Sequence, residues 1–171
     1  MGSWLPAPRE RRARRRDLAE FAPAATWNVV EQLILAATRR SPDEFAAAAR
    51  RMSTGPASID HNAQLLALFL LCTCVARLLG TNSDDESIAS TASRIEPSLR
   101  QFVRVDRRDV EQTLRFGLRP YAPDVQETAR TAILGSAVIG VIFEDPLAEI
   151  AELRDPAVRE VERLLARRAG T

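Results

Sequence analysis

The stretch Asn62–Leu79, NAQLLALFLLCTCVARLL, most constrains how this chain can fold. From Leu65 to Ala76 it carries a single hydroxyl group and no charge. A helix that is apolar around its whole circumference is buried on all sides. The uninterrupted apolar run is shorter than the roughly 20 residues that a helix needs to cross a bilayer. The sequence therefore predicts that this stretch is the central helix of a soluble bundle and that it stops at Gly80.

Length and composition favour one all-α domain. A chain of 171 residues fits the usual domain size, and 46% hydrophobic with 27% charged residues is typical of a globular protein. Aromatic residues make up only 5%, whereas alanine, leucine and arginine are abundant, which favours helix over strand. Counting the helix signals, we predict a single-domain bundle of about seven to nine helices around two buried hydrophobic helices. Residues 17–171 would form this domain, and residues 1–16 a mobile arm.

Signals for helix starts, a capping residue followed by proline or an acid, recur along the chain. The first predicted helix runs from Pro23 to about Arg39 and buries one apolar stripe. Pro97 should interrupt a later helix, since proline cannot donate the backbone hydrogen bond. The predicted caps of the other helices are Ser41, Ser58 or Asp60, Ser83, Asp106, Asp145 and Asp155.

The second apolar helix is predicted from Asp124 to Phe143. Small residues recur in it every four positions, at Ala132, Ser136 and Gly140, and such a row lets another helix approach closely. We expect this row to pack against the central helix. Gly140→Leu should then overpack the core by about 1–3 kcal/mol.

The formal net charge of +1 hides a strong asymmetry. Residues 9–16, RERRARRR, hold six arginines and one glutamate, whereas the rest of the chain holds 18 arginines and 22 acids. The six arginines would occupy every face of a helix, so they cannot all pack on the body. We expect them to contact an anionic partner. The arginines of this predicted site are Arg9, Arg11, Arg12, Arg14, Arg15 and Arg16, with Arg104, Arg107 and Arg108 as the other candidate anion site.

Several partners suit such an arm. Clustered arginines bind the phosphates of a nucleic acid, although the body shows no helix-turn-helix, zinc finger or aromatic platform. An acidic protein, or a solvated tail without a partner, fits the charge equally well. An anionic membrane, helped by Trp4 and Leu5, is the less favoured choice.

Catalytic and cofactor signatures are missing from the sequence. There is no phosphate-binding glycine-rich loop and no lysine, and His61 is the only histidine. Cys72 and Cys74 lie two residues apart on one predicted helix, so they point to different sides and cannot form a disulfide with each other. We predict buried structural thiols, a reducing cytoplasm, and no catalytic residue, cofactor or metal.

These observations lead to a functional expectation. We predict a non-catalytic α-helical interaction or regulatory module that acts through its surfaces, with a protein partner or self-association. The alternative is a protein that binds the nucleic-acid backbone, or a small nucleoprotein subunit, using the arginine-rich arm. No small-molecule substrate is evident. The complete absence of lysine is typical of a GC-rich bacterial genome.

Overall fold

A computed structural model shows an all-helical chain, which confirms the predicted fold class. The structure describes residues 22–54, 57–118 and 125–170. Within these residues eight helices and no strand form a single-domain bundle, as the sequence predicted. The predicted arm, residues 1–16, lies outside the described residues.

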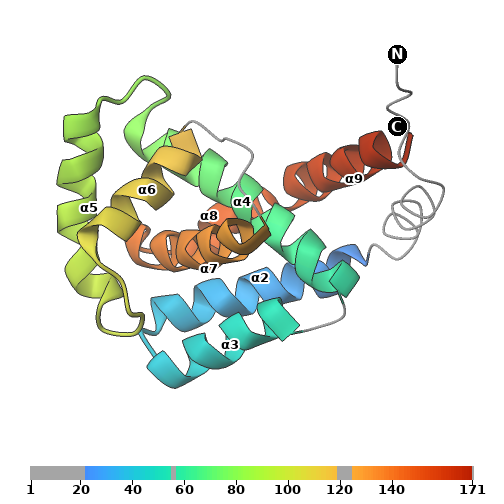
Figure 1. The fold of residues 1–171 in the computed structure, drawn as a ribbon, viewed down its shortest axis with the longest axis horizontal. Helices are drawn as coiled ribbons and strands as arrows, with labels where there is room; N and C mark the ends of the chain where they lie inside the picture. The colour runs from blue at the N-terminus through green and yellow to red at the C-terminus, as the bar shows by residue number, and fades with distance from the viewer. Residues whose placement is uncertain (1–21, 55–56, 119–124, 171) are drawn as a thin grey trace, which may run out of the picture.

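Figure 1 shows how the helices are arranged, with α2 and α3 side by side along one edge and α5 and α6 together at one end. The last helix, α9, extends away at the opposite end. The helices are α2 (Pro23–Thr38), α3 (Pro42–Thr54), α4 (Ala57–Leu79), α5 (Asp85–Leu99), α6 (Arg107–Leu118), α7 (Val125–Ile142), α8 (Pro146–Ala151) and α9 (Arg154–Gly170).

The core is built where α7 packs against α2 and α4, which are its most extensive contacts. Every residue of α7 from Leu134 to Gly140 is buried, so this predicted hydrophobic helix is a true core element. The stripe predicted for the first helix is also buried. It consists of Trp27, Val30, Leu33, Ile34 and Ala37.

Local signals placed several helix starts correctly. Ser41 Oγ accepts the backbone N–H of Glu44 at 3.4 Å, and Asp145 accepts that of Ala148 at 3.1 Å. At the start of α6 the capping is reciprocal, because Asp106 and Asp109 each accept the backbone N–H of the other. Each bond satisfies a donor that the first helical turn leaves without a partner.

Other predicted starts were wrong by a few residues. The cap of α5 is Asp84, not Ser83, because the Asp84 carboxylate accepts the Ser87 N–H at 2.8 Å. Hydrogen bonds from Ser87, first from its side chain and then from its backbone, lower the pKa of Asp84. The Ser83 hydroxyl instead donates to the carbonyls of Leu79 and Gly80.

Two further helices begin earlier than predicted. The central helix α4 starts at Ala57, so Ser58 and Asp60 lie inside it and neither precedes it as a cap. Likewise α9 starts at Arg154, which places Asp155 in its first turn, where an acid still favours the positive end of the helix dipole.

Pro97 does not interrupt α5, which continues to Leu99. Proline at this position removes one backbone donor, the one that would reach the Ser93 carbonyl. Ser93 and Pro97 are both exposed, so water can satisfy that carbonyl, and the helix ends two residues later.

The row of small residues on α7 does not face the central helix at Gly140, contrary to prediction. A Cβ there would lie 2.6 Å from Ala37 Cβ and 2.9 Å from the Ile34 carbonyl oxygen, and both neighbours belong to α2. The close approach to α4 occurs instead at Gly135, where a Cβ would meet Leu71 at 2.8 Å. Because α7 lies between two helices, it uses a different glycine for each.

The central helix is not buried on all sides, which corrects the first expectation. Residues His61–Leu79 form a 19-residue segment of mean hydropathy 1.8, long and apolar enough to cross a membrane by length and composition. The prediction considered only the uninterrupted apolar run. The longer segment also includes polar residues before that run, but its many leucines keep the mean hydropathy of the whole segment high. Half of the apolar window is buried inside the bundle, and core helices of soluble proteins pass the same test. The helix stops at Gly80 as predicted, with a left-handed φ of 77°.

Candidate functional site

One face of α4 carries a row of half-buried apolar side chains, most of which pack against the edge of the core and stay partly exposed. We call this row the outer stripe, and it consists of Leu65, Phe69, Cys72, Ala76 and Leu79. Alternating steps of four and three residues place all five on one face of the helix. The opposite face of α4, with Ala67, Leu70 and Cys74, is buried in the bundle.

The two cysteines mark these two faces. Both are free thiols, Cys74 in the core and Cys72 half-buried in the outer stripe. Burial raises the pKa of Cys72 to about 11 and that of Cys74 to about 12. Since only the thiolate is a good nucleophile, neither cysteine is activated for chemistry near neutral pH.

A pocket of about 560 Å³ lies between the turn after α5, the start of α6 and α7. We call it the arginine pocket, because three of its lining side chains are guanidinium groups. It is lined by Arg100, Val103, Arg104, Val105, Asp106, Asp109 and Arg130.

The charged groups of the arginine pocket are only partly paired. Arg130 forms an ion pair with Asp109, and Arg100 Nε donates to Glu96 at 2.8 Å and to the Val105 carbonyl at 3.3 Å. Arg104 is exposed and has no ion-pair partner among the described residues. The pocket therefore holds one guanidinium group that forms no ion pair with the described residues and two others with unused donors.

The structure separates the arginines that the sequence grouped together. Of the second predicted anion site, Arg104 lines the pocket, whereas Arg107 does not and is held by Glu111 at 2.7 Å. Arg108 is exposed, with no ion pair in the described part of the chain. The six predicted arm residues lie outside the described residues. They are Arg9, Arg11, Arg12, Arg14, Arg15 and Arg16.

Sequence reasoning missed Arg100 and Arg130. Arg100 carried a local signal, because it precedes Arg104 by four residues and ends a helix, where basic groups are common. Arg130 carried none, since it reaches the pocket only because α7 lies beside α6 in the bundle.

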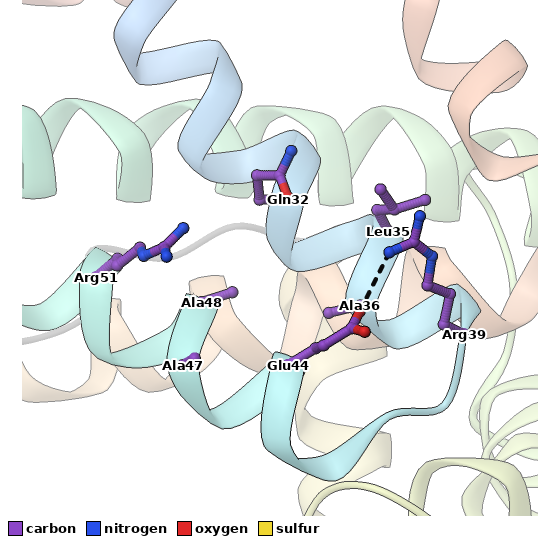
Figure 2. Close-up of a pocket in the computed structure, with 8 residues that line it drawn as sticks. All are labelled: Gln32, Leu35, Ala36, Arg39, Glu44, Ala47, Ala48 and Arg51. Carbon is purple, nitrogen blue, oxygen red and sulfur yellow. Dashed lines mark hydrogen bonds and ion pairs between the residues drawn. The ribbon is translucent and has the colours of Figure 1, made fainter.

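A smaller groove of about 210 Å³ lies between α2 and α3 (Figure 2). The side chains of Ala36 and Ala48 are buried along it, and the ion pair of Arg39 with Glu44, at 3.3 Å, closes one end. Arg51 lies at the other end in Figure 2. The groove is smaller than the roughly 300–1,000 Å³ typical of ligand sites, and we assign it no ligand.

Other candidate chemistry finds little support in the described residues. No group of three or more histidine, cysteine or acidic side chains comes together there to hold a metal ion. His61 lies half-buried within α4 rather than at its start, because the helix begins at Ala57. No protein-family model, no curated protein and no solved structure matches the chain. Among the described residues, the outer stripe and the arginine pocket are surfaces suited to binding a partner.

Proposed function

We propose that the protein is a non-catalytic helical interaction module that acts through the outer stripe of α4. The observation that carries this proposal is the half-buried state of Leu65, Phe69, Cys72, Ala76 and Leu79 on one helix face. Alternation of four and three residues is the spacing of a coiled-coil seam, in which a second helix covers such a row. The two free thiols fit a reducing compartment, which supports a cytoplasmic location.

The partner that fits best is a second copy of this chain. A two-fold interface needs a patch that is complementary to itself, and an apolar row on one helix face can meet this requirement when two copies pack against each other. Cys72 lies midway between Leu65 and Leu79, so two antiparallel copies of the stripe would be centred on it. Burial of the five side chains would then continue the core across the interface.

Sedimentation velocity over a range of protein concentrations tests this proposal. We expect a monomer–dimer equilibrium whose Kd rises at least about tenfold in Leu65→Gln, because an amide replaces an apolar contact at the seam. Leu147→Gln is the matched control, since Leu147 is also a half-buried leucine packed on the core but lies on α8. A monomer at every concentration, or equal effects of the two variants, would contradict self-association.

Binding to a nucleic-acid backbone is the second candidate function. It is supported by the exposed Arg104 and Arg108, which have no ion pair in the described chain, and by the charge of residues 9–16. Removal of residues 1–16 should leave the Tm nearly unchanged and weaken oligonucleotide binding equally across sequences. The log–log salt slope should flatten by about 0.7–0.9 for each lost phosphate contact. Full-strength, salt-sensitive binding by the truncated protein would move the site to the arginines of the body.

A further inference from the structure

We propose that the arginine pocket binds a small phosphorylated molecule. The pocket does not touch the outer stripe, so the inference does not rest on self-association. It starts from the fact that Arg100, Arg104 and Arg130 come from the end of α5, the following turn and α7, and line one pocket. Arg130 lies far from Arg100 and Arg104 in the sequence, and the fold brings the three guanidinium groups to one place.

The hydrogen-bonding donors of the pocket exceed its acceptors. Each guanidinium group carries five N–H donors. Arg104 uses none with the described residues, and Arg100 uses its Nε, which leaves both terminal nitrogens. Neither carboxylate of the lining pairs with Arg104: Asp109 accepts from Arg130 and from the Asp106 backbone, and Asp106 accepts from the Asp109 backbone. An oxyanion is the ligand that such a surplus of charged donors recognises.

The number of donors favours phosphate over carboxylate. One guanidinium fork suffices for the two oxygens of a carboxylate, whereas a terminal phosphate group presents three strong acceptor oxygens and up to two charges. Arg104 would form the new ion pair. Arg100 and Arg130, already oriented by Glu96 and Asp109, would supply the further donors.

The pocket has room for a ligand with an organic part as well as a phosphate group. Its volume of about 560 Å³ lies within the range of small-molecule sites and far exceeds the space of a phosphate ion. Val103 is half-buried and Val105 is 7% exposed, so apolar side chains share the lining with the guanidinium groups. A phosphate ester would place its oxygens on the arginines and its carbon skeleton on these valines.

Two-dimensional NMR of the full chain tests the proposal, with inorganic phosphate, a mononucleotide and a single-stranded oligonucleotide as probes. Each titration is run at constant ionic strength against sodium chloride. We expect saturable shifts of the backbone amides of Val103, Val105 and Arg130 with phosphate, and tighter binding of the mononucleotide. Arg104→Gln should weaken both by about tenfold, since it removes a charge-assisted bond. Arg159→Gln, an exposed arginine on α9, should change neither.

Each other outcome overturns the inference. Shifts that grow linearly with added phosphate, shifts that sodium chloride produces equally, or equal binding by the Arg104 and Arg159 variants would mean that the pocket is only a solvated charged surface. Binding of the oligonucleotide without the mononucleotide would assign these arginines to a nucleic-acid backbone instead. Unchanged amide spectra of the variants away from the substitution verify that both remain folded.

Discussion

The two faces of α4 present the same kind of side chain but meet different surroundings. Leu66 on the inner face is fully buried, whereas its neighbour Leu65 in the outer stripe is only half-buried. The inner face packs against α2 and α7, and no other described part of the chain covers the outer stripe to the same degree. Hydrophobicity alone thus does not say how deeply a residue is buried, because burial also needs an element to cover it.

Truncation of Leu66 and Leu65 should show the largest difference in stability between the two faces of α4. We expect Leu66→Ala to lower the free energy of unfolding by about 3 kcal/mol, since it opens a cavity in a packed core. Leu65→Ala should lower it by about 1 kcal/mol at concentrations where the protein is monomeric, because part of its surface is already in water. Urea unfolding of both variants measures the difference. Equal losses would mean that the outer stripe is as well covered as the inner face.

The two close contacts of α7, through Gly140 to α2 and through Gly135 to α4, should also differ in how they tolerate an added methyl group. Gly140→Ala should destabilise the protein by about 2 kcal/mol, because the new Cβ would lie 2.9 Å from the Ile34 carbonyl oxygen, a backbone atom that cannot move alone. At Gly135 the neighbour is the Leu71 side chain, which can shift. Alanine also forms helix better than glycine by about 1 kcal/mol.

Gly135→Ala is therefore the matched control for the contact between α2 and α7, and we expect its Tm to stay near that of the unchanged protein. Thermal unfolding of the two variants, followed by circular dichroism, gives the ranking. If Gly135→Ala were the more damaging change, α7 would be fixed by α4 rather than by α2.

We expect the two cysteines to have a smaller effect on the free energy of unfolding, and this effect should depend on pH. Burial raises the pKa of both thiols above the ordinary value of 9.0, so the folded state retains their protons where the unfolded state loses them. Their contribution to stability is complete below about pH 9. It is lost as the pH rises through about 11 for Cys72 and about 12 for Cys74.

Chemical unfolding at pH 7 and pH 10 checks this prediction. The loss of stability at pH 10 should shrink in Cys74→Ser and by a similar amount in Cys72→Ser, since the pKa of each folded thiol lies above pH 10. An identical pH dependence in all three proteins would show that other groups cause it.

The sequence predicted what local signals determine. The caps at Asp106 and Asp145 depend on a few adjacent residues, and both were correct. The partner of Gly140 depends on where α7 lies in the bundle, and a row of small residues indicates a close contact without naming the helix that makes it. Arg130 was missed for the same reason. Its role in the arginine pocket exists only after three segments have come together.

The boundary of the central helix shows a second limit. Ser58 and Asp60 are good capping residues, yet the helix begins before both, at Ala57. Such residues are also tolerated inside a helix, and their preference for the cap is about 1 kcal/mol, which other interactions can override. The half-buried state of Phe69 could not be predicted either, because the run from Leu65 to Ala76 is apolar on every side of the helix.

Cross-linking through Cys72 tests the central claim, self-association through the outer stripe, most directly. Prolonged treatment with a short bis-maleimide at pH 9, where a small fraction of the Cys72 thiol with its pKa of about 11 is ionised, should join two chains through Cys72, because this residue lies at the middle of the stripe. Intact mass spectrometry should show a covalent dimer in the unchanged protein and in Cys74→Ser, and none in Cys72→Ser. A cross-link that requires the inner Cys74, or a dimer that forms no cross-link although Cys72 reacts with a monofunctional maleimide under the same conditions, would contradict the outer stripe as the interface.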